Sequence, residues 1–326
     1  MKKILILTTL AAAFFASCSS DNPMLTVPDD SGGNNNGLIT PNLQATVNTT
    51  DNTQSPMSGV LEIYPCQPGK SIYYGNYVND VLTPFPGYYN LQNGAIFGSN
   101  NRPISLPVGT YNMIYWGTPK YEEPIYSNPA ITEPTLSLGV DLSQQYFGLR
   151  KNPSDTTYYP VFDLVYAVKP ANIGSEELSA AMKRQVAGLK VIVKDKNNGI
   201  LSASIASMNV HIGGIAEKIN VYTAALVNQT KTVAFPLVLS ADGTQMSNAT
   251  VMLFPSAIKP LFQLIITLKN GTVKTFKQAL NAPLKANSKL TLTLTLGDIF
   301  SEENPGNFTI DNWQEESETI DVPVLD

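Results

Sequence analysis

One segment of the chain, residues 289–296, can bury a continuous face only as a β-strand. Its sequence, Lys-Leu-Thr-Leu-Thr-Leu-Thr-Leu, alternates leucine with lysine or threonine at every step. Because successive side chains of a strand point to opposite faces, this pattern places four leucines on one face. A shift of one residue would expose all four leucines, so the segment predicts a strand of well-specified register.

Similar short apolar segments, separated by turn-forming residues, recur along most of the chain. Many short strands with turns between them indicate an all-β fold of sandwich type. We expect hairpin turns at Asn198-Gly199, Asp242-Gly243 and Asn270-Gly271, because such pairs favour tight turns between strands. The other predicted strands are residues 43–47, 60–64, 161–168, 187–193, 201–206, 233–239, 249–254, 261–268 and 273–279.

Residues 106–111, Leu-Pro-Val-Gly-Thr-Tyr, predict a corner of a type common in sandwich domains. Pro107 and Gly109 should set the turn, and Tyr111 should pack beneath it. This pattern speaks to the fold and carries no chemistry.

One short helix is expected, and it is taken as the join between two domains. Pro170 should end the preceding strand, and Ser175 is a suitable N-cap for a helix that runs to about Lys183. Glu176 and Glu177 would lie in its first turn, where the helix dipole favours negative charge.

The first 17 residues have the layout of a secretory signal peptide. Lys2 and Lys3 precede an apolar run, Ile4 to Phe15, which is too short to span a bilayer. Phe15-Ala-Ser-Cys18 resembles a lipobox, and we therefore expect cleavage before Cys18 and lipidation of its thiol. An ordinary signal peptide with a chance cysteine is the alternative.

The mature chain should be organised as a tether followed by two domains. The residues after Cys18 are small, polar and turn-forming, which is typical of a flexible segment. The 309 residues after the signal exceed what one core usually holds. We predict a signal peptide at 1–17, a lipidated tether at 18–37, and β-sandwich domains at 38–172 and 173–326, the second with an extended C-terminal strand.

Charge and cysteine content exclude several classes of protein. Removal of the signal leaves 19 basic and 26 acidic residues, a net charge of −7, which disfavours nucleic acid as a partner. With Cys18 lipidated, Cys66 is the one remaining thiol, so no intrachain disulfide can form. Cys66 has no base among its neighbours in sequence, and we expect a small buried side chain.

Residues that could support catalysis or bind a metal are few. His211 is the sole histidine and lies on a strand-like run, so we expect a structural role, no metal site and no cofactor. The sequence contains no G-x-S-x-G, and we predict that the protein is not an enzyme. Glu122, Glu123 and Asp163 are nominal carboxylates for a glycosidase, which stays a third alternative.

Tyrosines are concentrated between residues 64 and 126, with Asn, Gly and Pro interleaved. Two interpretations stay open: tyrosines that cover a sandwich core with their hydroxyls at its edge, or an aromatic surface for a sugar or protein. The candidate surface residues are Tyr73, Tyr74, Tyr88, Tyr89 and Tyr121.

A resemblance to a known family is carried by the lipobox to Cys18 and the segments 106–111, 163–167 (Asp-Leu-Val-Tyr-Ala), 184–191 (Arg-Gln-Val-Ala-Gly-Leu-Lys-Val) and 308–313 (Phe-Thr-Ile-Asp-Asn-Trp). Together these features resemble the fimbrillin superfamily, the type V pilus proteins of Bacteroidetes, and within it the FimB-type anchor or accessory subunits.

The resemblance implies two transthyretin-like Greek-key sandwiches, attachment to the outer membrane and assembly with other pilin subunits by β-strand exchange. From Cys18 to Gly69 the chain has no Lys or Arg, so a trypsin-like protease finds no site before Lys70. We therefore expect an uncut anchor or accessory subunit that donates a C-terminal strand through Ile320, Val322 and Val324.

Besides the glycosidase, two alternatives to this assignment remain. One is a surface glycan-binding lipoprotein that belongs to a polysaccharide-utilisation system, with the tyrosine-rich loops as its binding face. The other is a stalk or tip pilin that a trypsin-like protease processes.

Overall fold

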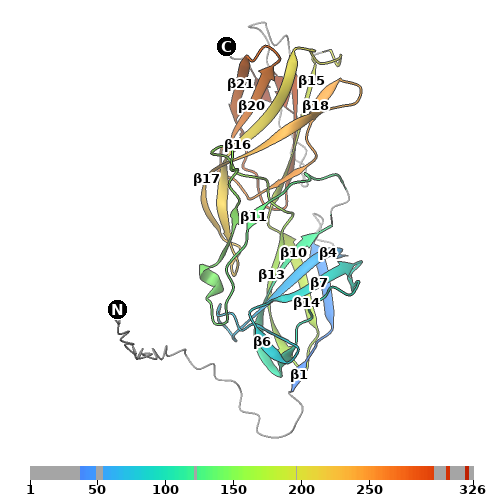
Figure 1. The fold of residues 1–326 in the computed structure, drawn as a ribbon, viewed down its shortest axis with the longest axis vertical. Helices are drawn as coiled ribbons and strands as arrows, with labels where there is room; N and C mark the ends of the chain where they lie inside the picture. Colours follow the sequence, from blue (N-terminus) through green and yellow to red (C-terminus); the bar gives the residue numbers. More distant parts are fainter. Residues whose placement is uncertain are drawn as a thin grey trace, which may run out of the picture. The chain divides into compact units, whose positions relative to one another are not determined.

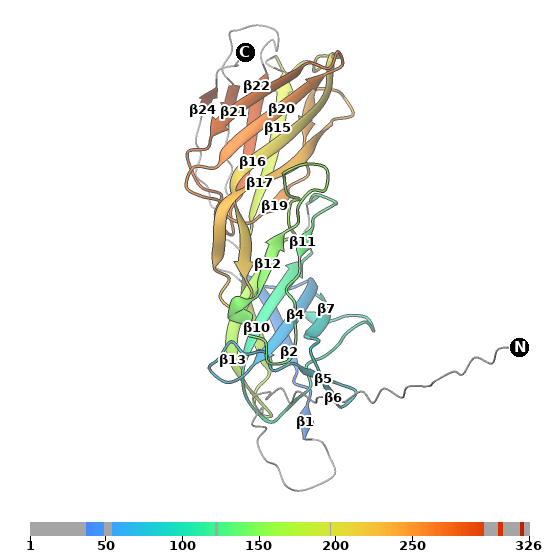
Figure 2. The same ribbon diagram turned by 60° about the vertical axis from the view of Figure 1, so that its left-hand side comes forward.

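Two large β-sheets contain most strands of the described chain (Figures 1 and 2). The computed structural model describes residues 37–48, 54–120, 123–195 and 197–296, together with the backbone of 306–308 and 320–322. The prediction of an all-β fold is confirmed, since the described helix is a single 3-10 turn, η1 (Leu142–Gln144). The predicted signal peptide, Cys18 and nearly all of the tether lie outside the described residues.

The first sheet has the strand order β3-β2-β14-β13-β10-β4-β7-β8. Its strands are antiparallel except for β2 and β14, which run parallel. Two small two-stranded sheets, β1-β9 and β5-β6, accompany it. The bounds are β1 (Leu38–Ile39), β2 (Leu43–Asn48), β3 (Gln54–Pro56), β4 (Gly59–Cys66), β5 (Asn76–Val78), β6 (Val81–Thr83), β7 (Gly87–Gln92), β8 (Ala95–Ile96), β9 (Leu106–Pro107), β10 (Gly109–Pro119), β13 (Val165–Ile173) and β14 (Leu178–Arg184).

The second sheet follows the path β11-β12-β16-β17-β18-β15-β19, with β20 paired to β16, β21 paired to β20, and β22 paired to β15. The last two strands, β23 and β24, pair with each other. The bounds are β11 (Ile131–Thr132), β12 (Tyr146–Leu149), β15 (Ala187–Asp195), β16 (Ile205–Asn220), β17 (Leu226–Leu239), β18 (Gln245–Ser247), β19 (Val251–Leu253), β20 (Leu261–Leu268), β21 (Val273–Ala279), β22 (Lys289–Leu296), β23 (Gly306–Phe308) and β24 (Ile320–Val322).

The strand predicted from the leucine alternation is confirmed as β22. Leu290, Leu292 and Leu294 are buried, and the threonines between them are half-buried. The strand pairs with β15 in parallel along its whole length, from Gly188↔Lys289 to Asp195↔Leu296. Pairing between segments this far apart in sequence cannot be read from the local pattern.

Of the three predicted hairpins, the one at Asn270-Gly271 is confirmed, because β20 and β21 flank it in antiparallel register. The hairpin at Asn198-Gly199 is wrong: β15 pairs with β18, β19 and β22, whereas β16 pairs with β12, β17 and β20. The turn at Asp242-Gly243 exists, but it joins β17 to β18, and residues 251–253 pair with β15 instead.

The predicted helix from Ser175 to Lys183 is wrong, because this segment forms strand β14. Its start does form a local turn, in which the backbone N–H groups of Ser175 and Glu176 donate to Asn172 O. The chain then extends, and Leu178, Ala180 and Met182 are buried while their neighbours are more exposed. Pairing with β2 and β13 in the sheet therefore outweighs the local helix signals.

Pro170 also fails to end its strand. β13 continues to Ile173, with Pro170 opposite Asn112 of β10. Nor do the sheets change at residue 172: β14 lies beyond it in the first sheet, while β11 and β12 precede it and belong to the second. The division into domains at 172 stays a prediction. Each of the two sheets contains strands from both sides of this residue.

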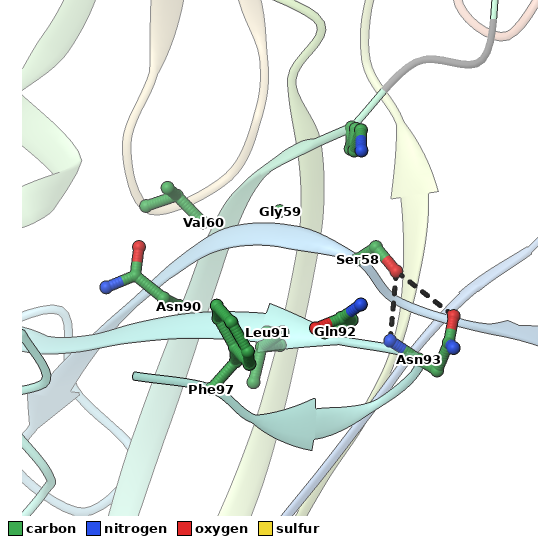
Figure 3. Close-up of a pocket in the computed structure, with 9 residues that line it drawn as sticks. Ser58, Gly59, Val60, Asn90, Leu91, Gln92, Asn93 and Phe97 are labelled. Atoms are coloured by element: carbon green, nitrogen blue, oxygen red, sulfur yellow. Dashed lines mark hydrogen bonds between the residues drawn. The ribbon is translucent and has the colours of Figure 1, made fainter. Parts of the chain in front are cut away.

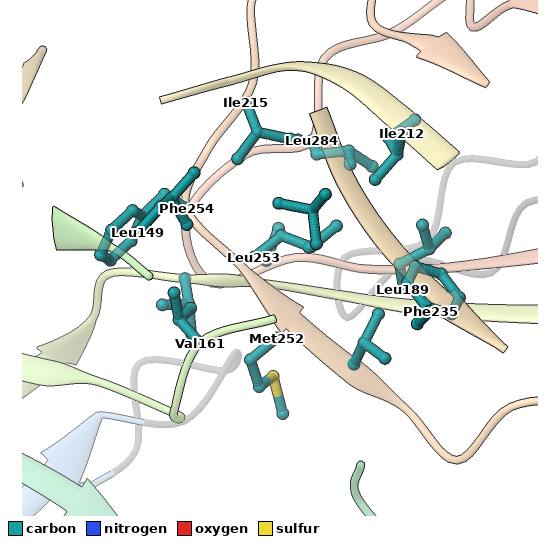
Figure 4. Packing of buried hydrophobic residues seen from close by; sticks show 14 of the residues in the cluster. Leu149, Val161, Leu189, Ile212, Ile215, Phe235, Met252, Leu253, Phe254 and Leu284 are labelled. Carbon is teal, nitrogen blue, oxygen red and sulfur yellow. The ribbon is translucent and has the colours of Figure 1, made fainter. Parts of the chain in front are cut away.

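Strands β4 and β10 are buried on both faces, which explains the unbroken apolar run from Met113 to Trp116. Met113 and Tyr115 belong to the core of the first sheet. Ile114 and Trp116, on the opposite face, belong to the core that the second sheet builds. Figure 4 shows part of that second core, to which β17 contributes Phe235, β19 contributes Leu253, and the residue after β19 contributes Phe254.

The corner predicted at residues 106–111 is confirmed. The Tyr111 hydroxyl donates to Pro107 O at 3.2 Å, and the ring is 6% exposed beneath the turn. Gly109 has a φ of 156°, a conformation that glycine adopts more readily than other residues.

Candidate functional site

The N-terminal strands are the part of the chain that a trypsin-like protease would remove from a processed pilin. Here they are paired with strands of the first sheet or with β9. β1 pairs with β9, while β2 lies between β3 and β14. Asn42 and Gln44 each donate a side-chain hydrogen bond to Glu177, at 3.2 Å, and so connect β2 to the start of β14. These strands are held by both backbone and side-chain contacts.

Lys70, the first basic residue after the signal, is exposed in the turn that follows β4. β4 is paired with β10 on one edge and with β7 on the other. Leu61, Ile63 and Cys66 of this strand are all fully buried. Cleavage at Lys70 would therefore detach an internal strand of the sheet together with the strands before it.

The candidate donor residues fall in and beside the last described strand. Ile320 and Val322 lie in β24, whose backbone pairs with β23 in the register Phe308↔Ile320 and Gly306↔Val322. Val324 lies outside the described residues. The β-conformation expected of this segment is thus found for residues 320–322.

A hairpin of the second sheet packs its tip onto β10 and β13 of the first. Trp116 Nε1 donates to Val221 O at 2.8 Å, and Asn112 Nδ2 donates to the Tyr222 hydroxyl at 2.7 Å. The Tyr166 hydroxyl donates to Tyr222 O. Trp116 also packs edge-on against Phe147 at 5.0 Å between ring centroids. This joint combines directional bonds with aromatic packing in a buried environment.

Most of the tyrosines proposed as a surface are core residues, and that interpretation is corrected for three of them. Tyr73, Tyr74 and Tyr89 are 0%, 8% and 1% exposed. The Tyr89 hydroxyl accepts from Ile104 N at 2.7 Å, and burial raises the pKa of Tyr89 to about 12. Tyr88 is half-buried beside Arg102, and Tyr121 lies outside the described residues. Tyr73 belongs to the core of the second sheet, and Tyr74 and Tyr89 belong to the core of the first, so the number of tyrosines reflects packing.

A pocket lies on the face of the first sheet where β4, β7, β8 and the end of β10 meet (Figure 3). Its volume is about 810 Å³, within the range of ligand-binding clefts. Exposed Phe97 and several amide side chains surround it, and among the described residues that line it Lys120 is the charged one. The lining residues are Ser58, Gly59, Val60, Asn90, Leu91, Gln92, Asn93, Phe97 and Lys120.

A strand glycine and a glycine-containing turn shape this pocket. Gly59 has a φ of 131°, and a Cβ there would lie 2.3 Å from Thr118 O, so glycine permits β10 to end against β4. Asn93 and Gly94 both have positive φ and form the tight turn of the β7–β8 hairpin. This hairpin was not among those predicted, although Asn-Gly between Leu91 and Ile96 is the same signal that located β20–β21.

The residues considered for catalysis are placed apart and mostly paired. Asp163 is buried and forms a bidentate ion pair with Arg184, at 2.7 and 2.8 Å. Glu123 pairs with Lys289, and Glu122 lies outside the described residues. His211 lies in mid-strand on β16, and burial lowers its pKa while Asp155 opposes the shift.

Cys66 is fully buried, as predicted, and burial raises the pKa of its thiol to about 12. Such a thiol is neutral at physiological pH and a poor nucleophile. Within the described ranges, no group of three His, Cys, Asp or Glu residues is arranged to hold a metal ion. The described part of the chain also has no helix long and apolar enough to cross a membrane.

Comparison with known proteins gives one family match that covers most of the chain. Residues 34–319 match the family of fimbrillin-A associated anchor proteins Mfa1 and Mfa2. Comparison with curated protein sequences finds no match.

Several solved structures share the fold at low sequence identity. A candidate polysaccharide-binding protein from Bacteroides thetaiotaomicron superposes with a TM-score of 0.54 and 13% identity, over 85% of this chain and 96% of that one. The fimbrial anchor protein Mfa2 from Porphyromonas gingivalis gives 0.50 and 12%, over 87% and 99%. A candidate adhesin from Bacteroides ovatus gives 0.52 and 10%, over 85% and 94%.

Proposed function

The chain belongs to the family of fimbrillin-A associated anchor proteins, and from this premise we propose that it is a structural subunit of a fimbrium, of the anchor or accessory type. In this role it acts at the cell surface, binds other fimbrial subunits and supports cell adhesion. The family match over residues 34–319 is the observation that carries the proposal.

The proposed attachment to the outer membrane is a lipid on Cys18. The lipobox-like segment ends at this residue, and three acyl chains on the new N-terminus exceed the two signals that already give stable anchoring. The polar segment after Cys18 would hold the folded part away from the bilayer.

The absence of Lys and Arg between Cys18 and Gly69 supports an uncut subunit over a trypsin-processed stalk or tip pilin. Cleavage at Lys70 would remove β4, and the buried residues Leu61, Ile63 and Cys66 would leave the sheet with it. Loss of an internal strand disrupts two ladders and two cores, whereas release of an edge strand disrupts far less.

We propose that the subunit joins its neighbour by donating the strand that contains Ile320, Val322 and Val324. Alternate side chains of a donated strand would fill pockets in the acceptor, and its backbone would complete the acceptor sheet. β24 already has the required extended conformation, with β23 paired along one edge.

Analysis of the subunit in purified fimbriae tests the attachment and the processing. The expected mature form begins at acylated Cys18, and Cys18→Ala should abolish palmitate labelling. A mature form that begins after Lys70 would replace the anchor assignment with the stalk assignment.

Strand donation has a separate test. Truncation after Glu318, or Ser in place of Ile320, Val322 and Val324 together, should abolish incorporation into fimbriae. Asp321→Ser, which changes the alternate face of the same strand, is the matched control. Normal incorporation of the triple variant would contradict the donor role.

A glycan-binding surface lipoprotein is a second candidate, and the pocket beside Phe97 is the observation that favours it. Affinity electrophoresis in polysaccharide gels separates the two candidates, since a glycan binder is retarded and a purely structural subunit is not.

A further inference from the structure

We propose that the pocket between β4, β7, β8 and the end of β10 binds an acidic oligosaccharide, with one sugar ring on Phe97 and a sugar carboxylate near Lys120. This inference rests on the second candidate function, glycan binding, for which it names the ligand class, and it does not depend on the fimbrial role. It rests on strand register, on side-chain chemistry and on the rigidity of the pocket.

Strand register places the pocket residues in two rows on one face of the sheet. In the first row, Phe97 N donates to Asn90 O at 2.8 Å, and Asn90 is opposite Val60. The second row contains Gln92, Ser58 and Lys120. Gln92 lies two residues after Asn90 and so on the same face of β7, and Lys120 N donates to Ser58 O, just before β4, at 2.7 Å. Figure 3 shows Phe97 and Asn90 beside each other over this face.

The two ends of the pocket are separated by three strand spacings, since Phe97 follows β8 and Lys120 follows β10. With neighbouring strands about 4.8 Å apart, this is about 14 Å across the sheet. A single sugar ring does not reach that far. The occupant that would contact both ends is therefore an oligosaccharide.

Phe97 is 61% exposed, so the apolar face of its ring is open to solvent beside the pocket. A flat exposed ring offers the apolar surface on which the C–H face of a sugar stacks. When a ligand covers an exposed aromatic ring, the burial of that ring supplies a substantial part of the binding free energy. Phe97 supplies the apolar part of the site.

Amide groups supply the polar part. Asn90 Nδ2 donates to Asn100 O at 2.9 Å, which orients the side chain. Within the described chain, no hydrogen bond is found to Asn90 Oδ1 or to the Gln92 amide. An amide both donates and accepts, so it matches the paired donor and acceptor character of a sugar hydroxyl. These groups are suited to hydroxyls of a glycan.

Lys120 gives the pocket its charge. It is exposed, and no ion pair to it is found among the described residues. The described lining contains no carboxylate. Because no described residue of the lining offers Lys120 a carboxylate, we expect this ammonium group to attract an anion, and on a glycan that also stacks on Phe97 this anion is the carboxylate of an acidic sugar.

The pocket is formed before any ligand enters. Asn93 N donates to Ser58 Oγ at 2.9 Å and Gly94 N donates to Met57 O at 2.8 Å, so the β7–β8 turn is fixed against β4. Such preorganisation lowers the entropy lost on binding. It also favours a ligand that fits a hollow over a protein partner that needs a broad flat surface.

Calorimetric titration of the mature protein, produced as Cys18→Ser, tests the proposal. The probes are trimers or longer oligomers of galacturonic acid, hyaluronan oligomers and sialyllactose, each beside its carboxyl-reduced form. We expect at least one acidic probe to bind at least fivefold more tightly than its reduced form, with the preference lost in 1 M salt. Failure of every acidic probe to bind, or equal binding of the reduced forms, would overturn the proposal.

Two variants assign the binding to this pocket. Phe97→Ala should weaken binding of the acidic probe at least fivefold, and Lys120→Gln should remove the preference for the acidic form. The matched controls are Phe85→Ala, at a residue that is 54% exposed between β6 and β7, and Lys285→Gln, and both should leave binding unchanged. Thermal melts confirm folding of each variant.

The pocket could instead serve assembly, and the same variants decide this. If Phe97→Ala reduced incorporation into fimbriae and left glycan binding intact, the site would be a protein contact and the proposal would be wrong. Glycan binding lost with normal incorporation supports the proposal, whatever the result for strand donation.

Discussion

Trp116 Nε1 donates a hydrogen bond to Val221 O at 2.8 Å, across the boundary between the two sheets. Trp116 belongs to β10 and is 2% exposed, and Val221 begins the turn between β16 and β17. Because neither group is open to solvent, water cannot easily replace the bond. The residues on either side of this bond are therefore coupled in stability.

Trp116→Phe removes the donor and part of the aromatic packing against Phe147. The carbonyl of Val221 is left buried without its partner, and we expect the free energy of unfolding to fall by about 2–4 kcal/mol. Urea unfolding followed by far-UV circular dichroism measures the change. An unchanged midpoint would show that the joint contributes nothing to stability.

Tyr115→Phe, at the residue before Trp116, should stabilise the protein, in contrast to Trp116→Phe. The Tyr115 hydroxyl is buried and has no hydrogen-bond partner among the described residues. Removal of an unsatisfied buried hydroxyl should raise the free energy of unfolding by about 1 kcal/mol. The same urea experiment measures it, and a loss of more than about 1 kcal/mol would indicate a partner for this hydroxyl.

The Asp163–Arg184 ion pair connects the segment before β13 to the end of β14. Asp163→Asn leaves a largely buried guanidinium without its bidentate acceptor, and we expect a loss of about 3–5 kcal/mol. The double variant Asp163→Leu with Arg184→Met should be more stable than Asp163→Asn, because it removes both charges and leaves apolar side chains in their place. Chemical unfolding of all three proteins gives the comparison.

Gly59 is required where β10 ends against β4. Gly59→Ala places a Cβ 2.3 Å from Thr118 O at a φ of 131°, and we expect a loss of at least about 3 kcal/mol. Gly139, at φ 77°, has nothing within 4 Å of its Cβ position. Gly139→Ala should therefore cost only the backbone strain, about 1–2 kcal/mol, as thermal unfolding would report.

Cys66 should be unreactive in the folded protein. In the Cys18→Ser variant, iodoacetamide at pH 8 should label Cys66 only at the rate at which the chain unfolds, and rapidly in urea. Labelling of the folded protein at the rate of a free thiol would contradict the burial of Cys66.

The raised pKa of Cys66 also gives a direction to the pH dependence of stability. The thiol ionises near pH 8.5 in an unfolded chain and near pH 12 in the folded one, where burial opposes the charge. Its contribution is complete below about pH 8.5 and declines as the pH rises towards 12. A Cys66→Val variant should lose less stability over this range than the parent protein.

Local patterns predicted strands well where period and turn chemistry agreed. The leucines of β22 and the Asn270-Gly271 turn needed no information from the rest of the chain. The Leu106–Tyr111 corner was found in the same way, because each of its contacts lies within six residues.

The errors arose where distant pairing decided the structure. Ser175 and the two glutamates after it are typical of a helix start, and a turn does form there. The residues that follow nevertheless form strand β14, because they pair with β2. The burial of Tyr73, Tyr74 and Tyr89 was equally hidden, since composition cannot say which face of a strand is covered. The pocket depends on β8, β7, β4 and β10 lying side by side, which only the folded sheet establishes.

The parallel pairing of β2 with β14 constrains the order in which the first sheet can fold. Leu43 of β2 pairs with Leu178 of β14. A chain synthesised from its N-terminus therefore cannot complete the first sheet until more than half of its length is available. Contacts of such wide sequence separation slow folding. The polypeptide therefore has an interval during its synthesis in which one edge of β2 is still unpaired and open to a chaperone or a protease.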